Sequence, residues 1–341
     1  MRKRLETITI IILIVAALAA THLYITFYTP ASKTGELKLV NVQKGTSFRV
    51  VAANLEKAGV IRDSDSFIFA ANILGAYKKI KAGEYEFNTS MTPMEVLEFL
   101  VKGRIKRHLV TIPEGFNIKD IAAELKAEGI LEPEAFLKKA ADKKFISSLG
   151  IEGKSLEGYL FPDTYIFTKG MTPEEVITKM VDNFRGVYNS EFEKVAKQRG
   201  MSQTKVLTLA SIIEKETGAP GERPLISAVF HNRLKKGIKL QSDPTVIYDA
   251  KDFDGNLTKK HLLTKSPYNT YVVYGLPPGP IANPGKASIS AALNPANEDY
   301  LYFVSRNDGT HLFTKNLKDH NKAVNQFQRN FKVNAQTAKK G

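Results

Sequence analysis

The sequence predicts an α+β protein that begins with a single membrane-spanning helix. Three observations support this fold class: a long uncharged apolar run near the N-terminus, an internal repeat of strand, turn and helix patterns, and a C-terminal half in which helices alternate with loops rich in Pro, Gly and aromatic residues. The chain has 341 residues, of which 43% are hydrophobic and 25% charged, so it is long enough for two or three domains with buried cores.

The composition restricts the chemistry that the chain can perform. It contains no Cys, which excludes disulfides, thiolate metal sites and a thiol nucleophile. Its six His residues show no H-E-x-x-H spacing, so we expect neither a metal centre nor another cofactor. No G-x-S-x-G elbow occurs, which disfavours a Ser-His-Asp hydrolase. Carboxylates, hydroxyls and amides remain as the candidate reactive groups.

Residues 8–28 form the predicted membrane-spanning helix. These 21 positions contain no Asp, Glu, Lys or Arg, and about 20 apolar residues are enough to cross a bilayer. Segment 1–7 carries three basic residues and one acid, so we expect a cytoplasmic tail there and the rest of the chain outside the cell (inner) membrane. A cleaved signal peptide is the alternative, because Ala17-Leu18-Ala19 resembles a cleavage site, but the apolar run continues beyond it.

The net charge of +14 lies almost entirely in the outward part, which has 46 basic and 34 acidic residues. A surplus of this size often indicates nucleic acid binding. The expected location and the lack of a nucleic-acid motif argue against that partner. Anionic lipid headgroups or an acidic wall polymer fit the location better, and an ordinary Lys-rich surface explains the charge equally well.

An internal repeat follows a predicted linker at 29–36. Segments 42–61 and 112–131 match at a constant offset of 70 residues. Each combines a β-prone lead-in, a Gly turn and a helix with one apolar stripe, and a Gly follows each helix as the C′ residue. The identical pairs are Gly45 and Gly115, Ala52 and Ala122, Ala53 and Ala123, Leu55 and Leu125, and Gly59 and Gly129.

This β-α-α pattern is similar to that of LysM-type glycan-binding modules, so we expect a LysM-like region over 37–150. Between the two copies, Gly83–Phe87 is typical of a strand. Thr92 followed by Pro93 predicts the capped start of a further helix. Such a region is suited to binding the cell wall and contains no candidate for catalysis.

The candidate catalytic carboxylates lie on a predicted helix that starts near Ser202 and stops at Gly218. Its apolar residues recur at i, i+3, i+4 and i+7, as on the buried face of an amphipathic helix. Glu214 and Glu216 lie near its end and are about 200° apart around the axis, so one cleft can hold only one of them. The periodicity favours Glu216 only slightly.

A carboxylate at this helix end suits acid catalysis. The negative end of the helix dipole and a partly apolar wall both raise a carboxyl pKa toward the range useful in glycoside cleavage. An ordinary solvated helix end is the alternative, and the spacing alone favours it. The surrounding loops favour a catalytic acid over an ordinary helix end, because their amides, carboxylates and Tyr rings suit a sugar-binding cleft.

Eight stretches in and around this helix form a recognisable set. They are EGYLFPDTY (157–165), ASIIEKET (210–217), ER (222–223), NRL (232–234), LQSDPTVIY (240–248), SPYNTY (266–271), GLPPGPIANPG (275–285) and YLYFV (300–304). In order and spacing, they resemble the YceG-like family of endolytic peptidoglycan (murein) transglycosylases. The resemblance covers most of residues 157–321, and the N-terminal anchor and LysM-like region match as well.

The resemblance implies a mixed α+β catalytic domain over 151–333, followed by a basic tail at 334–341. It assigns catalysis to the second Glu of E-K-E-T, which is Glu216. The implied reaction is lytic: Glu216 protonates the oxygen of the MurNAc–GlcNAc β-1,4 bond and then accepts the proton of the MurNAc C6 hydroxyl, which closes a 1,6-anhydro ring. No metal, cofactor or second carboxylate is required.

Four further side chains are candidates for holding sugar hydroxyls, ring faces and the acetamido group. They are Gln241, Asp243, Tyr268 and Asn269. The expected partners are peptidoglycan glycan strands, cut while nascent and near the membrane that holds the N-terminal helix. Peptidoglycan synthases are a further expected partner, and nucleic acid is not expected.

Two alternatives remain open at this point. A hydrolytic muramidase would use Asp243 or Glu222 as a second carboxylate beside the acid. A non-catalytic wall-binding scaffold would use the repeat region to bind strands without shortening them. Product mass separates the first alternative from lytic cleavage, because an anhydro end is one water lighter than a hydrolysed end.

Overall fold

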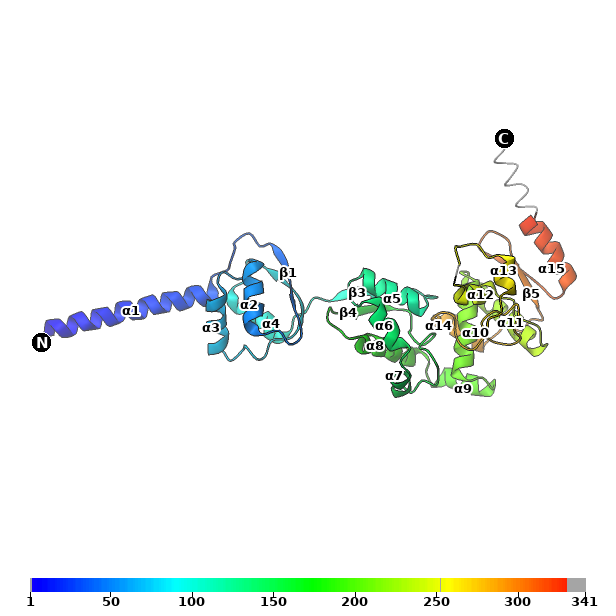
Figure 1. Cartoon of the computed structure of the whole chain (residues 1–341), viewed down its shortest axis with the longest axis horizontal. Helices are drawn as coiled ribbons and strands as arrows, with labels where there is room; N and C mark the ends of the chain where they lie inside the picture. Colours follow the sequence, from blue (N-terminus) through cyan, green and yellow to red (C-terminus); the bar gives the residue numbers. More distant parts are fainter. Residues whose placement is uncertain (1, 252, 330–341) are drawn as a thin grey trace, which may run out of the picture. The chain divides into compact units, whose positions relative to one another are not determined.

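The computed structural model describes residues 2–251 and 253–329, and the predicted basic tail at 334–341 lies outside them. Its helices and two-stranded sheets confirm the predicted mixed α+β class. The chain divides into two compact units (Figure 1). Unit 1 is Met1–Leu109 with Ile166–Met171, and unit 2 is Val110–Tyr165 with Thr172–Gly341.

The N-terminal helix α1 (Arg2–Tyr28) contains the predicted apolar run at 8–28. Its segment Glu6–Tyr28 has 23 residues and a mean hydropathy of 2.4, so its length and composition suffice to cross a bilayer. No residue of the apolar window within this segment is buried. A continuous apolar surface of this kind marks a contact with membrane or another apolar partner.

Unit 1 continues in the order strand, helix, helix, strand, helix. These elements are β1 (Leu37–Val42), α2 (Phe48–Lys57), α3 (Ser64–Ile73), β2 (Gly83–Asn88) and α4 (Pro93–Lys102). β1 pairs antiparallel with β2, and Val40 lies opposite Tyr85. The strand-helix-helix order predicted for the first repeat copy is present, and its helical stripe of Val51, Ala52 and Leu55 is buried in the core of this unit.

Unit 2 is mainly helical. Its helices are α5 (Ile118–Ala127), α6 (Pro133–Ala140), α7 (Lys143–Ser148), α8 (Pro173–Val187), α9 (Ser190–Gln198), α10 (Gln203–Glu216), α11 (Arg223–Lys235), α12 (Asp243–Asp249), α13 (Lys259–Leu263), α14 (Lys286–Leu293) and α15 (Leu317–Val324), with a short π-helix at Asn325–Arg329. Strands β5 (Tyr302–Ser305) and β6 (His311–Thr314) pair antiparallel. The division between the units falls within β3 (His108–Thr111) and β4 (Thr164–Phe167), which form the third sheet.

The second repeat copy belongs to unit 2, whereas the first belongs to unit 1. The predicted LysM-like region 37–150 therefore contributes residues to both units, and its bounds stay a prediction. The physical reason is the packing of the second copy, whose helix α5 buries Ile121 and Leu125 among elements of unit 2. Its Gly turn is also fixed there, because Gly115 N donates to Asn283 O at 2.9 Å.

Helix α10 lies at the centre of unit 2. Every residue from Val206 to Ile213 is buried, so the helix is covered on all sides and not on one face as its sequence predicts. Helices α14, α11, α12 and α9 all pack against it. This central position holds the last turn of α10, with Glu214 and Glu216, beside the loops that follow α11.

Candidate active site

A cavity of about 500 Å³ lies at the C-terminal end of α10. Glu216, the last residue of that helix, lines it together with residues from α11, the loop before α12, and the C-terminal sheet and helix. The other lining residues are Arg233, Leu240, Gln241, Asp243, Tyr271, Phe303, Val304, Ser305, His311, His320, Val324 and Gln328. One titratable carboxylate pair, Glu216 and Asp243, is therefore present in a wall that also contains aromatic rings and amides.

The two carboxylates at the end of α10 have different surroundings. Glu214 accepts a hydrogen bond from Arg223 Nη2 at 3.1 Å and another from Gly285 N at 2.9 Å, and its side chain is only 5% exposed. Those bonds hold α10 to α11 and to the start of α14. Glu216 instead lines the cavity, which is the placement that helical periodicity only slightly favoured.

Burial raises the pKa of Glu216 to about 7. The Ser242 hydroxyl donates a hydrogen bond to Glu216 Oε1. This bond lowers the pKa of Glu216, because it stabilises the carboxylate. The negative charge of Asp243 raises the pKa further, and the Arg233 guanidinium lowers it. A carboxyl with this pKa can both give and take a proton near neutral pH.

Ser242 is fixed by a hydroxyl cluster. Its side chain is buried, and its N–H donates to Thr270 Oγ1 at 3.0 Å. Thr245 Oγ1 lies 2.8 Å from Thr270 Oγ1 and donates to Ser242 O at 2.6 Å. Sequence reasoning did not select Ser242, although it lies between two selected residues in the stretch LQSDPTVIY.

The residue before Ser242 has an unusual backbone. Gln241 has φ of 52°, in the left-handed region that non-glycine residues rarely adopt. Gln241 N donates to Thr270 O at 3.1 Å, and Arg233 Nη1 donates to Gln241 Oε1 at 3.3 Å. Arg233 also donates to the carbonyls of Leu240 at 2.9 Å and Leu301 at 2.7 Å. Arg233 thus holds the loop in the conformation that brings Ser242 to Glu216.

Of the four predicted sugar-binding residues, the structure brings Gln241 and Asp243 into the cavity with Glu216. Tyr271, which sequence reasoning did not select, lines the same cavity and donates from its hydroxyl to Asp243 Oδ1 at 2.6 Å. Tyr268 is not among the lining residues, and its ring packs on that of Tyr248 with centroids 5.0 Å apart.

Asn269 also lies outside this cavity, and its amide has a role within its own loop. The side chain is 1% exposed, and Nδ2 donates to the carbonyls of His261, Leu262 and Thr264 at 3.2, 3.1 and 2.8 Å. Its Oδ1 accepts from Tyr271 N at 3.0 Å. These bonds occupy the whole amide, so Asn269 orders the loop that carries Tyr271.

Glu222, one of the two carboxylates considered for hydrolysis, is not a lining residue of the cavity. Its Oε1 accepts from His311 N at 2.7 Å, and its Oε2 lies 2.6 Å from His311 Nδ1. His311 does line the cavity, so Glu222 supports one wall from behind. Among the described residues, no group of three or more His, Cys, Asp and Glu side chains is arranged to hold a metal.

The sequence profile of the YceG-like family matches residues 40–326. The chain belongs to the YceG-like family. A Bacillus subtilis relative named endolytic murein transglycosylase is 36% identical over 303 residues, which cover 84% of either chain. A Streptococcus pneumoniae relative of the same name is 32% identical over 84% of this chain but only 57% of its own length. The crystal structure of a YceG-like protein from Listeria monocytogenes is 34% identical, with a TM-score of 0.59 over 85% of this chain and 100% of that one.

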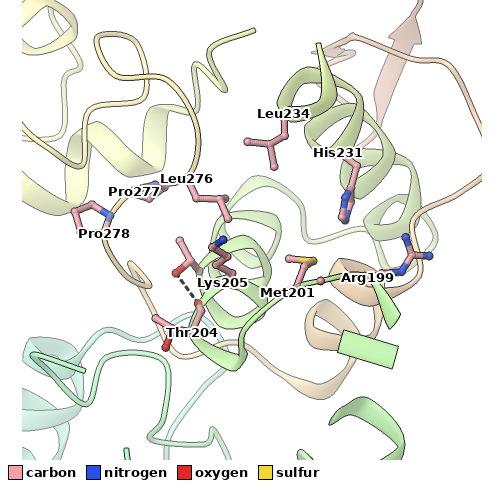
Figure 2. Close-up of a pocket in the computed structure, with 11 residues that line it drawn as sticks. Arg199, Met201, Thr204, Lys205, His231, Leu234, Leu276, Pro277 and Pro278 are labelled. Carbon is pink, nitrogen blue, oxygen red and sulfur yellow. Dashed lines mark hydrogen bonds between the residues drawn. The ribbon is translucent and has the colours of Figure 1, made fainter. Parts of the chain in front are cut away.

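A second cavity of this YceG-like protein, about 620 Å³, lies at the other end of α10 (Figure 2). Arg199, Lys205 and His231 line it, and Leu276–Pro278 contribute an apolar wall. His231 Nε2 lies 2.8 Å from Ala292 O, and burial lowers the pKa of His231. The lining contains no carboxylate. A carboxylic acid that could donate a proton therefore lines the Glu216 cavity, and none is among the lining residues of this one.

A buried polar network links two of the stretches that match the family, EGYLFPDTY (157–165) and GLPPGPIANPG (275–285). Asn283 Oδ1 accepts from Gly158 N and Leu160 N at 2.8 and 3.0 Å, and Asn283 Nδ2 donates to Glu157 Oε1 at 3.1 Å. Glu157 also accepts from Tyr248 Oη at 3.1 Å, and burial raises its pKa to about 7. This network stabilises the interior of unit 2, and none of its members lines the cavity at Glu216.

Proposed function

We propose that this chain is a membrane-anchored endolytic lytic transglycosylase, which cuts the MurNAc–GlcNAc β-1,4 bond of nascent peptidoglycan strands and thereby ends their elongation. The observation that carries the proposal is the placement of Glu216, whose partly buried carboxyl lines a cavity with amide and aromatic side chains and has its pKa raised to about 7. The relatives named endolytic murein transglycosylase support the substrate.

The proposed reaction uses one carboxyl group twice. Protonated Glu216 donates its proton to the glycosidic oxygen as the bond from that oxygen to MurNAc C1 breaks. The resulting carboxylate takes the proton of the MurNAc C6 hydroxyl as that oxygen bonds to C1, so the anhydro ring closes and Glu216 is protonated again. Ser242 engages Oε1 of Glu216 and fixes the carboxyl group for transfer through Oε2.

Product analysis tests this proposal. Full-length protein in detergent micelles is incubated with uncrosslinked peptidoglycan, and the new strand ends are identified by mass spectrometry. We expect shortened strands with 1,6-anhydro-MurNAc ends. A protein that binds strands but never shortens them would be the wall-binding scaffold, and the transglycosylase proposal would then be wrong.

A hydrolytic muramidase is the second candidate, because Asp243 shares the cavity with Glu216. Asp243 would have to activate water, but its Oδ1 already accepts the Tyr271 hydroxyl at 2.6 Å. Hydrolysis leaves reducing MurNAc ends, which are one water heavier than anhydro ends. Reducing ends as the main product would favour this candidate over lytic cleavage.

The pH dependence of cleavage provides a further prediction. The acid step needs protonated Glu216, so kcat/KM is expected to be constant at acid pH and to fall as pH rises through about 7. Asp243→Asn removes a charge that raises the pKa of Glu216, so its falling limb should move to lower pH. Ser242→Ala removes a bond that lowers this pKa, so its limb should move to higher pH. If the falling limbs of both variants stayed at the wild-type pH, the loss of activity would be due to titration of a group other than Glu216.

The remaining parts of the chain have proposed roles in localisation. We propose that residues 8–28 form a single-pass anchor with the N-terminus in the cytoplasm, which holds the active site outside the membrane, near the synthases that polymerise strands. We also propose LysM-like glycan binding for the first unit, supported by its strand-helix-helix-strand order. Both ideas concern where strands are cut and do not alter the chemistry at Glu216.

A further inference from the structure

We propose that unit 1 docks on the lipid surface through the C-terminal end of α3 and the turn that follows it. This surface, called the α3 tip, consists of Phe69, Ile73, Leu74, Tyr77, Lys78 and Lys79. Its apolar side chains would enter the headgroup layer of the bilayer, and its two lysines would contact anionic headgroups. The inference rests on the proposal that α1 spans the membrane and is independent of the chemistry at Glu216.

The α3 tip is a cluster of large apolar side chains that the protein leaves exposed. Phe69, Ile73, Leu74 and Tyr77 are 50%, 58%, 42% and 39% exposed. Phe69 and Ile73 are four residues apart and so lie on one side of α3, whereas Phe67, Ala70 and Ala71 face the core. Grouped apolar exposure of this kind marks an interaction site, unlike scattered single residues.

The position of α3 relative to α1 favours lipid as the partner. Segment Glu6–Tyr28 is about 34 Å long as a helix, slightly more than the roughly 30 Å of a hydrocarbon core. The last turn of α1 therefore lies at the outward-facing surface of the bilayer that it spans. Helix α1 contacts α3, and Figure 1 shows α3 lying across the end of α1. Elements that touch this end of the anchor lie in or near the headgroup layer.

The join between α1 and the rest of unit 1 is itself held by contacts. Thr26, in the last turn of α1, is buried, although the residues of the apolar segment before it are exposed. Arg62 Nε, just before α3, donates to Pro30 O at 2.7 Å. Glu36 N donates to Thr89 Oγ1 at 3.0 Å. These contacts keep α1 and the rest of unit 1 together, so α3 is not free to leave the surface.

Charge along α3 matches an anionic membrane. Asp63 and Asp65 lie at its start, and Lys78 and Lys79 follow its end. In the part of the chain that the structure describes, no salt bridge involves Lys78 or Lys79, and the Lys78 ammonium lies 5.3 Å from the centre of the Tyr77 ring. Apolar and aromatic side chains flanked by lysines are the composition found where helices lie in a bilayer interface.

The chain contains no Trp, which allows a direct test with one introduced fluorophore. Ile73→Trp places it in the α3 tip. Val50→Trp, at a position 49% exposed on α2 of the same unit, is the matched control. Each full-length variant is placed in nanodiscs of phosphatidylcholine and phosphatidylglycerol, with and without brominated acyl chains. Bromine quenches only a Trp that reaches the acyl region.

We expect brominated lipid to quench the Ile73→Trp emission about twofold or more and to leave Val50→Trp nearly unchanged, since interfacial helices enter the bilayer by about 5–10 Å. Adding Lys78→Glu and Lys79→Glu to Ile73→Trp should reduce quenching in discs that contain phosphatidylglycerol. Equal quenching of the two Trp positions would overturn the proposal. A blue-shifted Ile73→Trp emission that bromine does not quench would also overturn it, and would indicate a protein partner or a second copy.

Strand cleavage by the same variants is measured in detergent. This assay distinguishes a failure of the docking proposal from a failure of the proposed transglycosylase function. The α3 tip contributes no residue to the Glu216 cavity, so Ile73→Trp should cleave strands at the wild-type rate. Quenching without cleavage would leave the docking surface supported and the transglycosylase proposal wrong. Cleavage without quenching would support the transglycosylase proposal and would show that the docking proposal is wrong.

Discussion

Replacing Glu216 by Gln is expected to reduce kcat for strand cleavage by about 100- to 10,000-fold. Gln keeps the size of the side chain and an oxygen that can accept the Ser242 hydroxyl, but it cannot donate a proton to the glycosidic oxygen. Folding should be retained, because the burial that raises the pKa of Glu216 disfavours its charge and not a neutral amide. Release of anhydro ends from uncrosslinked peptidoglycan measures the rate, and circular dichroism monitors folding.

Glu214→Gln is the matched control for that variant. The same substitution two residues earlier weakens the charged hydrogen bond to Arg223 and leaves the cavity wall intact. We expect it to lower the melting temperature but to cleave strands at a rate within about tenfold of wild type below that temperature. If Glu216→Gln retained wild-type activity and Glu214→Gln lost it, the assignment of the two carboxylates would be reversed.

Replacing Asn283 by Ala is expected to lower the free energy of unfolding by about 3–5 kcal/mol. The side chain is fully buried and joins segments more than 100 residues apart. Ala would leave the N–H groups of Gly158 and Leu160 without their acceptor, and it would remove one of the donors to Glu157 and one of the donors to Phe116 O. Each buried polar group left unpaired costs about 1–3 kcal/mol.

Urea unfolding followed by circular dichroism measures this loss. Asn294→Ala is the control, because Asn294 is exposed and its amide makes one bond, to Ser290 O at 3.1 Å. A substitution of that kind should cost roughly 0.5–1 kcal/mol. If the two variants unfolded at the same urea concentration, the Asn283 network would not be a main support of unit 2.

Features that depend on local sequence could be predicted well. The start of α4 follows from Thr92, Pro93 and Glu95, and the structure shows the capping box: Thr92 Oγ1 accepts from Glu95 N at 3.2 Å, and Thr92 N donates to the Glu95 carboxylate at 2.7 Å. The helix over 8–28 and the strand at Gly83–Phe87 follow from composition and residue type in the same way.

Features that depend on tertiary contacts could not be predicted. The apolar stripes of the two repeat copies look alike, but nothing local tells which unit buries each of them. Helical spacing left Glu214 and Glu216 nearly equivalent until Arg223 and Gly285 were seen to engage Glu214. The resemblance to the family assigns catalysis to Glu216 from the motif alone, and this assignment stays a prediction.

The roles of single polar residues were the least predictable part of the site. Asn269 and Gln241 are both amides in loops that suit a sugar cleft, but only Gln241 lines the cavity. Asn269 uses its amide to satisfy buried carbonyls of its own loop. Ser242 and Arg233 act on Glu216 and Gln241 through contacts 8 to 26 residues apart in sequence, which residue type cannot reveal.

Digestion of uncrosslinked peptidoglycan in oxygen-18-labelled water tests most directly whether Glu216 acts without a second carboxylate and without water as the nucleophile. Mass spectrometry of the new MurNAc ends is the readout. Attack by the C6 hydroxyl predicts anhydro ends that carry no label, with the Glu216→Gln variant producing almost none of them. New ends that each carry one labelled oxygen would contradict this mechanism and would identify a hydrolase, with Asp243 as the candidate base.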